Sequence, residues 1–314
     1  MTPAASILLL TTATGFGYGL LAWLGAYATL GLLPLERDRA FVITGVALAL
    51  LLASIGLAAS TLHLGRKARA WRAFTQWRSS WLSREAVASV LTYPVAIALL
   101  IAVLRGGEGG WTRVLGFAAL AASLGTVFCT AMIYASLKPI RQWHNPHTAP
   151  DYLIYAVFSG AILVALLHTF VFGAPGTAAT VAIIAAAALA VIAKGLYWHH
   201  IGAQTPLATL AQAIGLPTDI EARPLDAPHF TENFVLREMG FTIARRHAAR
   251  LRRIALGAGF LLPAALSALA ALALIPTATM TLALVSAAIG LLVERWLFFA
   301  EATHVSALYY GRRI

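Results

Sequence analysis

The amino-acid sequence predicts an all-α, polytopic integral membrane protein: a bundle of about eight transmembrane helices with almost no mass outside the bilayer. Of its 314 residues, 60% are hydrophobic and 11% are charged, whereas a soluble domain carries about 25% charged residues because its surface faces water. Apolar runs long enough to cross a bilayer also recur along the chain, separated by short polar breaks. We therefore expect a single membrane domain over residues 1–314.

Each expected span is an apolar run of about 20 residues, the length that crosses the hydrocarbon core as a helix. The first run lacks a preceding Lys or Arg and is longer than a signal-peptide core, so we interpret it as an uncleaved helix although Ala26-Tyr27-Ala28 resembles a signal-peptidase site. Charged or Pro- and Gly-containing breaks, as at 34–37, 105–107 and 173–175, end other runs. The predicted spans are 5–33, 41–63, 85–104, 112–136, 152–172, 177–199, 254–275 and 278–300.

The basic residues assign the loops to sides of the membrane. The net charge is +11, and in a membrane protein Lys and Arg gather in cytoplasmic loops beside anionic lipid, so we expect lipid and not nucleic acid as the partner of this charge. The side with both termini and the loops near 64–84, 137–151 and 200–253 carries 18 Lys and Arg, counted with the adjoining helix ends, against 4 on the other side. The positive-inside rule then places both termini in the cytoplasm, with the bacterial inner membrane as the expected location.

Two basic segments on that side are expected to lie at the membrane interface. Residues 66–82 mix Arg and Lys with three Trp and one Phe, and residues 245–253 contain five Arg. Long cations and Trp suit the lipid headgroup layer, so an ordinary interfacial helix is one interpretation and a docking face for a cytoplasmic partner is the other. The residues proposed for docking are Arg72, Arg78, Arg245, Arg246 and Arg250.

Ionisable residues at the cytoplasmic helix ends are the candidate site. Such groups are costly in a membrane and are therefore functional candidates. Glu294, Glu301 and His304 fall within an arc of roughly 80° if the last helix continues past residue 300, and His63 and Glu85 flank one hairpin loop. A quinone head group needs hydrogen-bond partners and groups that move protons, which carboxylates and imidazoles provide.

Each of these residues also has a structural interpretation. His63 could be an interfacial histidine bonded to a backbone carbonyl, Arg84 and Glu85 could form an ion pair at a helix start, and Glu294 and Arg295 could pair between helices. The histidines could also be axial ligands of a haem, but a transmembrane haem relay needs a second histidine pair on the opposite side of the membrane, and the sequence has none there. The single cysteine, Cys129, cannot supply the about four thiolates of an iron–sulfur cluster. We expect no haem and no cluster in this chain.

Three stretches carry a family resemblance. Residues 61–74 read Thr-Leu-His-Leu-Gly-Arg-Lys-Ala-Arg-Ala-Trp-Arg-Ala-Phe, and residues 80–85 read Ser-Trp-Leu-Ser-Arg-Glu. Residues 232–241 read Glu-Asn-Phe-Val-Leu-Arg-Glu-Met-Gly-Phe, 245–253 read Arg-Arg-His-Ala-Ala-Arg-Leu-Arg-Arg, and 294–305 read Glu-Arg-Trp-Leu-Phe-Phe-Ala-Glu-Ala-Thr-His-Val. Together with the span count, they resemble the membrane-anchor family of DMSO reductase, and the 61–85 block is the specific part.

The resemblance implies a function that composition does not. Anchors of this family hold a four-cluster iron–sulfur subunit and a molybdopterin catalytic subunit at the membrane, and exchange electrons between quinone (menaquinone or ubiquinone) and the nearest cluster without a haem of their own. The family also includes the anchor of a quinone-linked sulfite dehydrogenase, which faces the cytoplasm, so substrate and direction stay open. The implied quinone-binding or proton-handling residues are His63, Gly65, Arg66, Arg69, Arg84 and Glu85, joined by Glu294, Glu301 and His304 from the helix-end cluster.

Two other classes compete with this hypothesis. A transporter or channel would favour internal repeats and a midplane site, whereas no clear repeat is present and the polar groups lie near one face. A purely structural anchor without a quinone site would bind no quinone analogue. On the leading hypothesis the chain is a non-catalytic, quinone-reactive subunit of a multi-subunit oxidoreductase.

Overall fold

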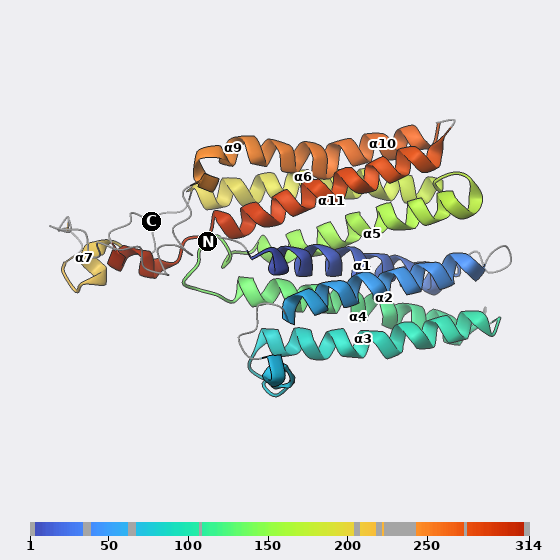
Figure 1. Cartoon of the computed structure of the whole chain (residues 1–314), viewed down its shortest axis with the longest axis horizontal. Helices are drawn as coiled ribbons and strands as arrows, with labels where there is room; N and C mark the ends of the chain where they lie inside the picture. The colour runs from blue at the N-terminus through green and yellow to red at the C-terminus, as the bar shows by residue number, and fades with distance from the viewer. Residues whose placement is uncertain are drawn as a thin grey trace.

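The computed structural model describes residues 4–33, 39–61, 67–106, 109–203, 208–217, 222, 243–272 and 275–310, with only the backbone of 67, 68, 243–246, 307, 309 and 310. Within these ranges eight helices are long and apolar enough to cross a membrane. They run back and forth along one axis, so that both termini lie at the same end of the bundle (Figure 1). The predicted all-α polytopic bundle is confirmed.

The elements follow in chain order. The spanning helices are α1 (Ala5–Leu30), α2 (Arg39–Thr61), α3 (Trp81–Leu104), α4 (Gly110–Ala135), α5 (Thr148–Phe172), α6 (Thr177–Ala203), the continuous α9 (Ile243–Leu256), η2 (Gly257–Leu261) and α10 (Leu262–Ala270), and α11 (Pro276–Ala300). Three short elements lie at the end that holds the termini: η1 (Lys67–Phe74), α7 (Leu210–Ala213) and η3 (Val305–Tyr310). We call this end the terminal face.

Several helix boundaries differ from the predicted spans because helices continue beyond the hydrocarbon core. α3 begins at Trp81, four residues before the predicted start, α5 begins at Thr148 instead of 152, and α6 continues to Ala203 instead of 199. The seventh crossing starts well before residue 254 and ends at Ala270 instead of 275. Hydropathy detects the apolar stretch, whereas the helix continues through polar turns whose side chains reach into the headgroup layer.

The seventh crossing contains a π-helical turn. η2 over Gly257–Leu261 directly precedes α10, which has Pro263 in its first turn. Proline has no backbone N–H and its ring clashes with the preceding turn of an α-helix, so one wider turn lets the helix continue. The result is one long crossing with a local adjustment instead of two separate helices.

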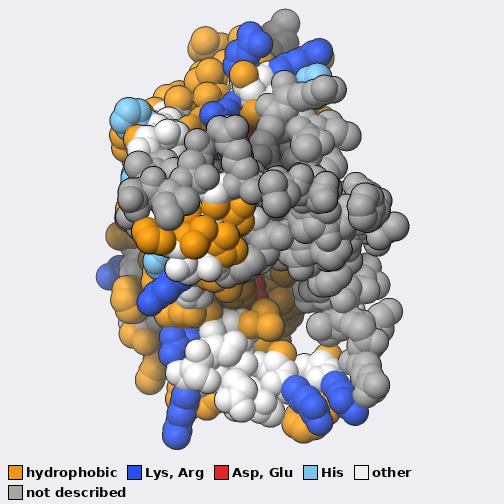
Figure 2. Space-filling view, turned by 90° about the vertical axis from the view of Figure 1, so that its left-hand side faces the viewer, with side chains coloured by type: hydrophobic (Ala, Val, Ile, Leu, Met, Phe, Trp, Pro, Cys, Tyr) orange, Lys and Arg blue, Asp and Glu red, His pale blue; other side chains and the backbone are white. Residues whose placement is uncertain are grey.

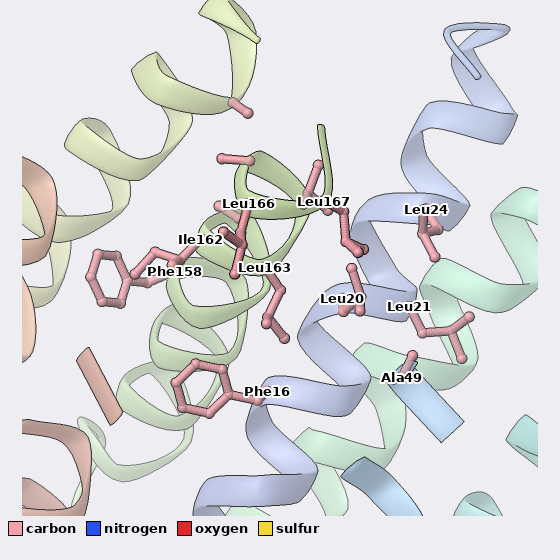
Figure 3. Packing of buried hydrophobic residues seen from close by; sticks show 14 of the residues in the cluster. Phe16, Leu20, Leu21, Leu24, Ala49, Phe158, Ile162, Leu163, Leu166 and Leu167 are labelled. Carbon is pink, nitrogen blue, oxygen red and sulfur yellow. The ribbon is translucent and has the colours of Figure 1, made fainter. Parts of the chain in front are cut away.

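The core of the bundle lies between α1 and α5. In their apolar windows 67% and 72% of residues are buried, against 28% in α3, which mainly faces lipid. Figure 3 shows Phe16 and Leu20 of α1 directed toward Leu163 and Leu167 of α5, whereas Phe158 points away from α1 and packs against Phe260 of η2. The outer helices instead expose large apolar side chains, as expected for a surface against lipid tails: Leu51, Leu91, Phe117, Leu189 and Leu282.

Small residues allow α1 and α5 to touch backbone to backbone. A Cβ added at Gly160 would fall on the backbone of Gly19, and one added at Gly19 would fall on the carbonyl of Ala156. Close approach through small residues is how helices associate in lipid, where no hydrophobic force holds them together.

We predict that Gly160→Ala destabilises the bundle by at least about 1–3 kcal/mol, because the new methyl group overpacks a backbone contact that cannot move. Gly195→Ala is the matched control, since an added Cβ there meets no atom within 4 Å. Thermal unfolding in detergent should show a lower melting temperature for Gly160→Ala and an unchanged or higher one for Gly195→Ala. Equal melting temperatures would contradict the packing described.

Candidate functional site

Buried charged side chains gather near the terminal face. α3 and α5 begin there, and α6 and α11 end there. The buried charged residues among the described positions are Glu85, Asp151, Lys194, Glu294, Arg295 and Glu301. A charge buried in a membrane protein without a partner is strongly unfavourable. The partners of these six residues therefore indicate which are fixed in ion pairs and which are free to exchange protons.

Glu85 is a buried carboxyl in the second turn of α3. It is 6% exposed, and it accepts a hydrogen bond from the Thr130 hydroxyl of α4 at 2.6 Å. No cation in the described part of the chain forms a salt bridge with it. A carboxyl held by one neutral donor can gain or lose a proton without breaking an ion pair, which suits it to act as a proton donor.

Arg84, its neighbour, turns away toward the surface. Its guanidinium donates to the carbonyls of Trp77 at 3.0 Å and Arg78 at 2.7 Å and stacks 4.2 Å from the Trp81 ring. The interpretation of Arg84 and Glu85 as a helix-start ion pair is therefore wrong, because Arg84 instead holds the loop that enters α3.

That loop forms an aromatic and basic surface before the start of α3, the helix that carries Glu85 in its second turn. Trp71, Phe74 and Trp77 are 60%, 44% and 52% exposed, and Arg72 and Arg78 lie over the rings of Trp71 and Trp77. In Figure 2, which looks onto the terminal face, Lys and Arg side chains lie around the rim of the described surface. Both expected uses of the loop, lipid-interface contact and partner docking, fit this exposure.

A second polar cluster connects α6 and α11. The Lys194 ammonium donates to Oε1 of Glu294 at 2.5 Å, and Arg295 approaches Oε2 of the same carboxylate at 3.7 Å. Lys194 and Glu294 are 1% and 0% exposed. Neither charge reaches water, so each depends on the other to compensate for its lost hydration.

Two tyrosines and an aspartate of α5 complete this cluster. The Arg295 guanidinium lies 3.6 Å from the ring centre of Tyr152 and 5.2 Å from that of Tyr155. Asp151, 4% exposed, lies within electrostatic reach of Lys194 and Arg295. Two cations thus face two carboxyl groups, so the cluster can be close to neutral overall.

Glu301 lies at the boundary between this cluster and the surface. Arg252 of α9 donates to its Oε1 from Nε at 3.0 Å, and its Nη2 lies 2.9 Å from the same oxygen. Burial raises the pKa of Glu301, and the Arg252 charge opposes this shift. Glu301 therefore retains a proton to higher pH than an ordinary surface glutamate.

The Glu85–Thr130 pair and the second polar cluster, which contains Glu294 and Arg295, border one small cavity. Thr130, which holds Glu85, and Arg295, which approaches Glu294, both line it. Its volume is about 10 Å³, the space of about one water molecule. Polar groups on α3 and α4 are thus joined through the middle of the bundle to those on α5, α6 and α11.

Comparison with known proteins identifies the family of this membrane bundle. Residues 6–301 match the family model described as "DMSO reductase anchor subunit (DmsC)". The chain belongs to the DMSO reductase anchor family. It is 34% identical to a sulfite dehydrogenase subunit of Allochromatium vinosum over 99% of both chains. It is 28% identical to the anaerobic dimethyl sulfoxide reductase chain YnfH of Escherichia coli over 42% of this chain and 46% of that one.

Family membership makes this chain a membrane anchor of an oxidoreductase complex and does not favour a transporter. Of the predicted site residues, the anchor subunit brings Glu294 and Glu301 to one side of α11, with Glu85 across the bundle. Arg69, Arg72, Arg78 and Arg250 are exposed. His63, Gly65 and Arg66, and the side chains of Arg245 and Arg246, lie outside the described residues.

The predicted placement of His304 on the α11 face is wrong. α11 ends at Ala300 with Glu301 as its C-cap, and the chain then turns so that His304 forms a bridge with Ile140. Its Nδ1 lies 2.8 Å from the Ser306 hydroxyl. Gln142 donates to the Thr303 hydroxyl at 2.9 Å and holds this turn against the loop before α5. The helical arc of three ionisable groups therefore reduces to two carboxyls.

Sequence reasoning missed four members of the anchor's second cluster. Asp151 precedes the predicted fifth span, although α5 already includes it, and Tyr152 and Tyr155 carry no charge to mark them. Lys194 is a lone cation in an apolar run, and a charge at that depth requires a carboxylate on another helix. The sequence could therefore have predicted a carboxylate partner for Lys194, although not that this partner is Glu294.

Proposed function

We propose that this anchor subunit exchanges electrons between quinone and a partner iron–sulfur subunit, which in turn serves a molybdopterin catalytic subunit. The observation that carries the proposal is buried Glu85, without a salt bridge among the described residues, in the helix that follows the aromatic and basic loop at the terminal face. Whole-length similarity to an oxidoreductase subunit supports the same class.

The chain's residues fit the requirements of a quinone head group. Bound quinone takes up two electrons and two protons, and quinol gives them back. Glu85 can hold or release a proton at a carbonyl oxygen placed near it, because only the Thr130 hydroxyl bonds its carboxyl among the described residues. His63, Gly65, Arg66 and Arg69 are proposed to border this site, with Glu294, Glu301 and His304 as further proton-handling candidates.

We propose that electrons flow toward quinone. A relative that is similar over 99% of both chains is part of a sulfite dehydrogenase, and a dehydrogenase removes electrons from its substrate. Similarity to the dimethyl sulfoxide reductase chain covers less than half of each protein. Sulfite is accordingly the first substrate to test on the catalytic partner.

We further propose that the terminal face lies in the cytoplasm and that the protein is in the bacterial inner membrane. The bias of 18 Lys and Arg to 4 favours this orientation. The exposed side chains of Arg72, Arg78 and Arg250 would then face the soluble subunits. Arg245 and Arg246 are proposed for the same role.

Affinity purification of the tagged chain from its native membrane tests the partners. We expect two further subunits to co-purify, together with molybdenum and iron. Reversing the charge of both Arg72 and Arg78 to Glu should reduce their recovery while the anchor stays in the membrane. Recovery of the anchor without a metal-containing partner would contradict the proposal.

A further inference from the structure

Gly15 in the middle of α1 has no packing role. Glycine in a helix costs about 1 kcal/mol relative to alanine, and close packing against other helices accounts for the next glycines of α1. A Cβ at Gly17 would come within 2.6 Å of the Ala49 carbonyl oxygen, one at Gly25 within 2.6 Å of the Gly116 carbonyl oxygen, and Gly19 touches α5. A Cβ at Gly15 would meet no atom within 4 Å.

The space beside Gly15 consists of two small cavities, and Arg295 lines both of them. Each has a volume of about 10 Å³, which is about one water molecule. Gly15, Thr11 and Arg295 line both, while Tyr152 lines one and Tyr155 the other.

Hydroxyl groups without partners border these cavities. The Thr12, Tyr152 and Tyr155 hydroxyls are buried and make no hydrogen bond to any described residue. A buried polar group is normally satisfied by protein or by ordered water, and a polar cavity of this size is where such water resides. Three orphan hydroxyls around two water-sized spaces therefore indicate internal water.

These cavities lie between acids that can carry protons. Thr130 lines the first cavity and bonds Glu85, whereas Arg295 lines both and approaches Glu294. Glu294 pairs with Lys194, which lies 5.4 Å from the Trp198 ring, and Arg252, the partner of Glu301, lies 5.1 Å from the same ring. Ionisable groups thus extend from Glu85 to the terminal face at Glu301.

We propose that the cavities beside Gly15 hold water and form a proton link across the bundle between Glu85 and the Glu294 cluster. The inference rests on the proposed quinone site, because it states how Glu85 regains the proton it gives to a quinone oxygen. For each quinone reduced, two electrons come from the partner's cluster and two protons enter from the terminal face. Each water or hydroxyl passes on one proton as it accepts another, and Glu85 ends in its starting state.

Arg295 orients this link without carrying its protons. A guanidinium stays protonated at any pH a protein experiences, so it cannot take part in the exchange. Its charge would repel a passing proton if unbalanced, but Glu294 lies 3.7 Å from it and Asp151 is within electrostatic reach. The balanced cluster keeps polar groups and water in the membrane interior at low net charge.

X-ray radiolytic labelling with mass spectrometry tests for the water, independently of any quinone. Hydroxyl radicals formed from internal water label side chains that touch it. In the purified complex we expect labelling of Tyr152 and Tyr155, and a loss of at least about ten-fold in Gly15→Val. Gly195→Val, on the lipid-facing side of α6, should leave the labelling unchanged. Absence of label on both tyrosines, or equal label in Gly15→Val, would overturn the inference.

Proton uptake during quinone reduction supplies the second readout. With a pH-indicator dye and a soluble quinone analogue, Gly15→Val should slow quinone reduction by about ten-fold or more, as expected when proton delivery is obstructed. The affinity for the analogue should stay unchanged. If Gly15→Val fails to assemble, Gly15→Ala serves, since the added carbon meets open space. A fully active Gly15 variant overturns the proton link alone, whereas an unaltered complex that does not reduce quinone overturns the proposed function.

Discussion

Lys194→Met is expected to destabilise the bundle by about 3–5 kcal/mol, because it leaves the Glu294 carboxylate buried without its ammonium partner. The pair is 2.5 Å long and almost completely buried. Methionine keeps the length of the lysine side chain, so lost packing contributes little. Thermal unfolding of the purified chain in detergent, together with its yield in the membrane, measures the effect.

The double variant Lys194→Met with Glu294→Leu is the matched control. Replacing both members of a buried ion pair with apolar residues of similar volume is often neutral or stabilising, whereas removing one member is not. The double variant should therefore recover most of the lost melting temperature. If the single variant is as stable as the unaltered chain, the Lys194–Glu294 pair does not exist as described.

Glu85→Gln should lower quinone turnover of the complex by about 10²-fold or more, the size of effect typical of a lost acid–base group. The amide oxygen still accepts the Thr130 hydroxyl bond, so the fold and the assembly should be retained. The affinity for quinone should change little, because the loss is in proton transfer. Steady-state kinetics with a soluble quinone analogue separates the two parameters.

Ser54→Ala provides the comparison for Glu85→Gln. Its hydroxyl bonds that of Tyr93 at an exposed contact between α2 and α3, so its removal also deletes one polar contact. We expect near-normal turnover for this variant. An assembled Glu85→Gln complex that reduces quinone at the normal rate would exclude Glu85 as the proton donor.

The sequence was sufficient to predict the bundle, its eight crossings and most of the acids that the structure buries near the terminal face. A continuous apolar run of about 20 residues crosses a bilayer as a helix, which satisfies its own backbone hydrogen bonds, whereas the strands of a membrane barrel are shorter and alternate in polarity. Glu85, Glu294 and Glu301 were found because ionisable residues at helix ends are rare and costly. These inferences depend on the chemistry of single segments, which a sequence shows directly.

What lay beyond the sequence depends on contacts between segments. The pairing of Lys194 with Glu294 joins residues 100 positions apart, and hydropathy does not specify which helices are neighbours. His304 was misplaced because the α11 arc assumed a helix that continues past Ala300, where α11 in fact ends. The proposed role of Gly15 rests on the empty space beside it, and that space is visible only once the positions of α5 and α11 are known.

The reoxidation of the partner's iron–sulfur clusters by quinone tests the central claim most directly. The clusters are reduced chemically, mixed rapidly with a quinone analogue, and followed by their visible absorbance, with and without this anchor subunit. We predict fast, quinone-dependent reoxidation only when the anchor is present. Equally fast reoxidation of the soluble subunits alone would contradict the account, because quinone would then react without the membrane bundle.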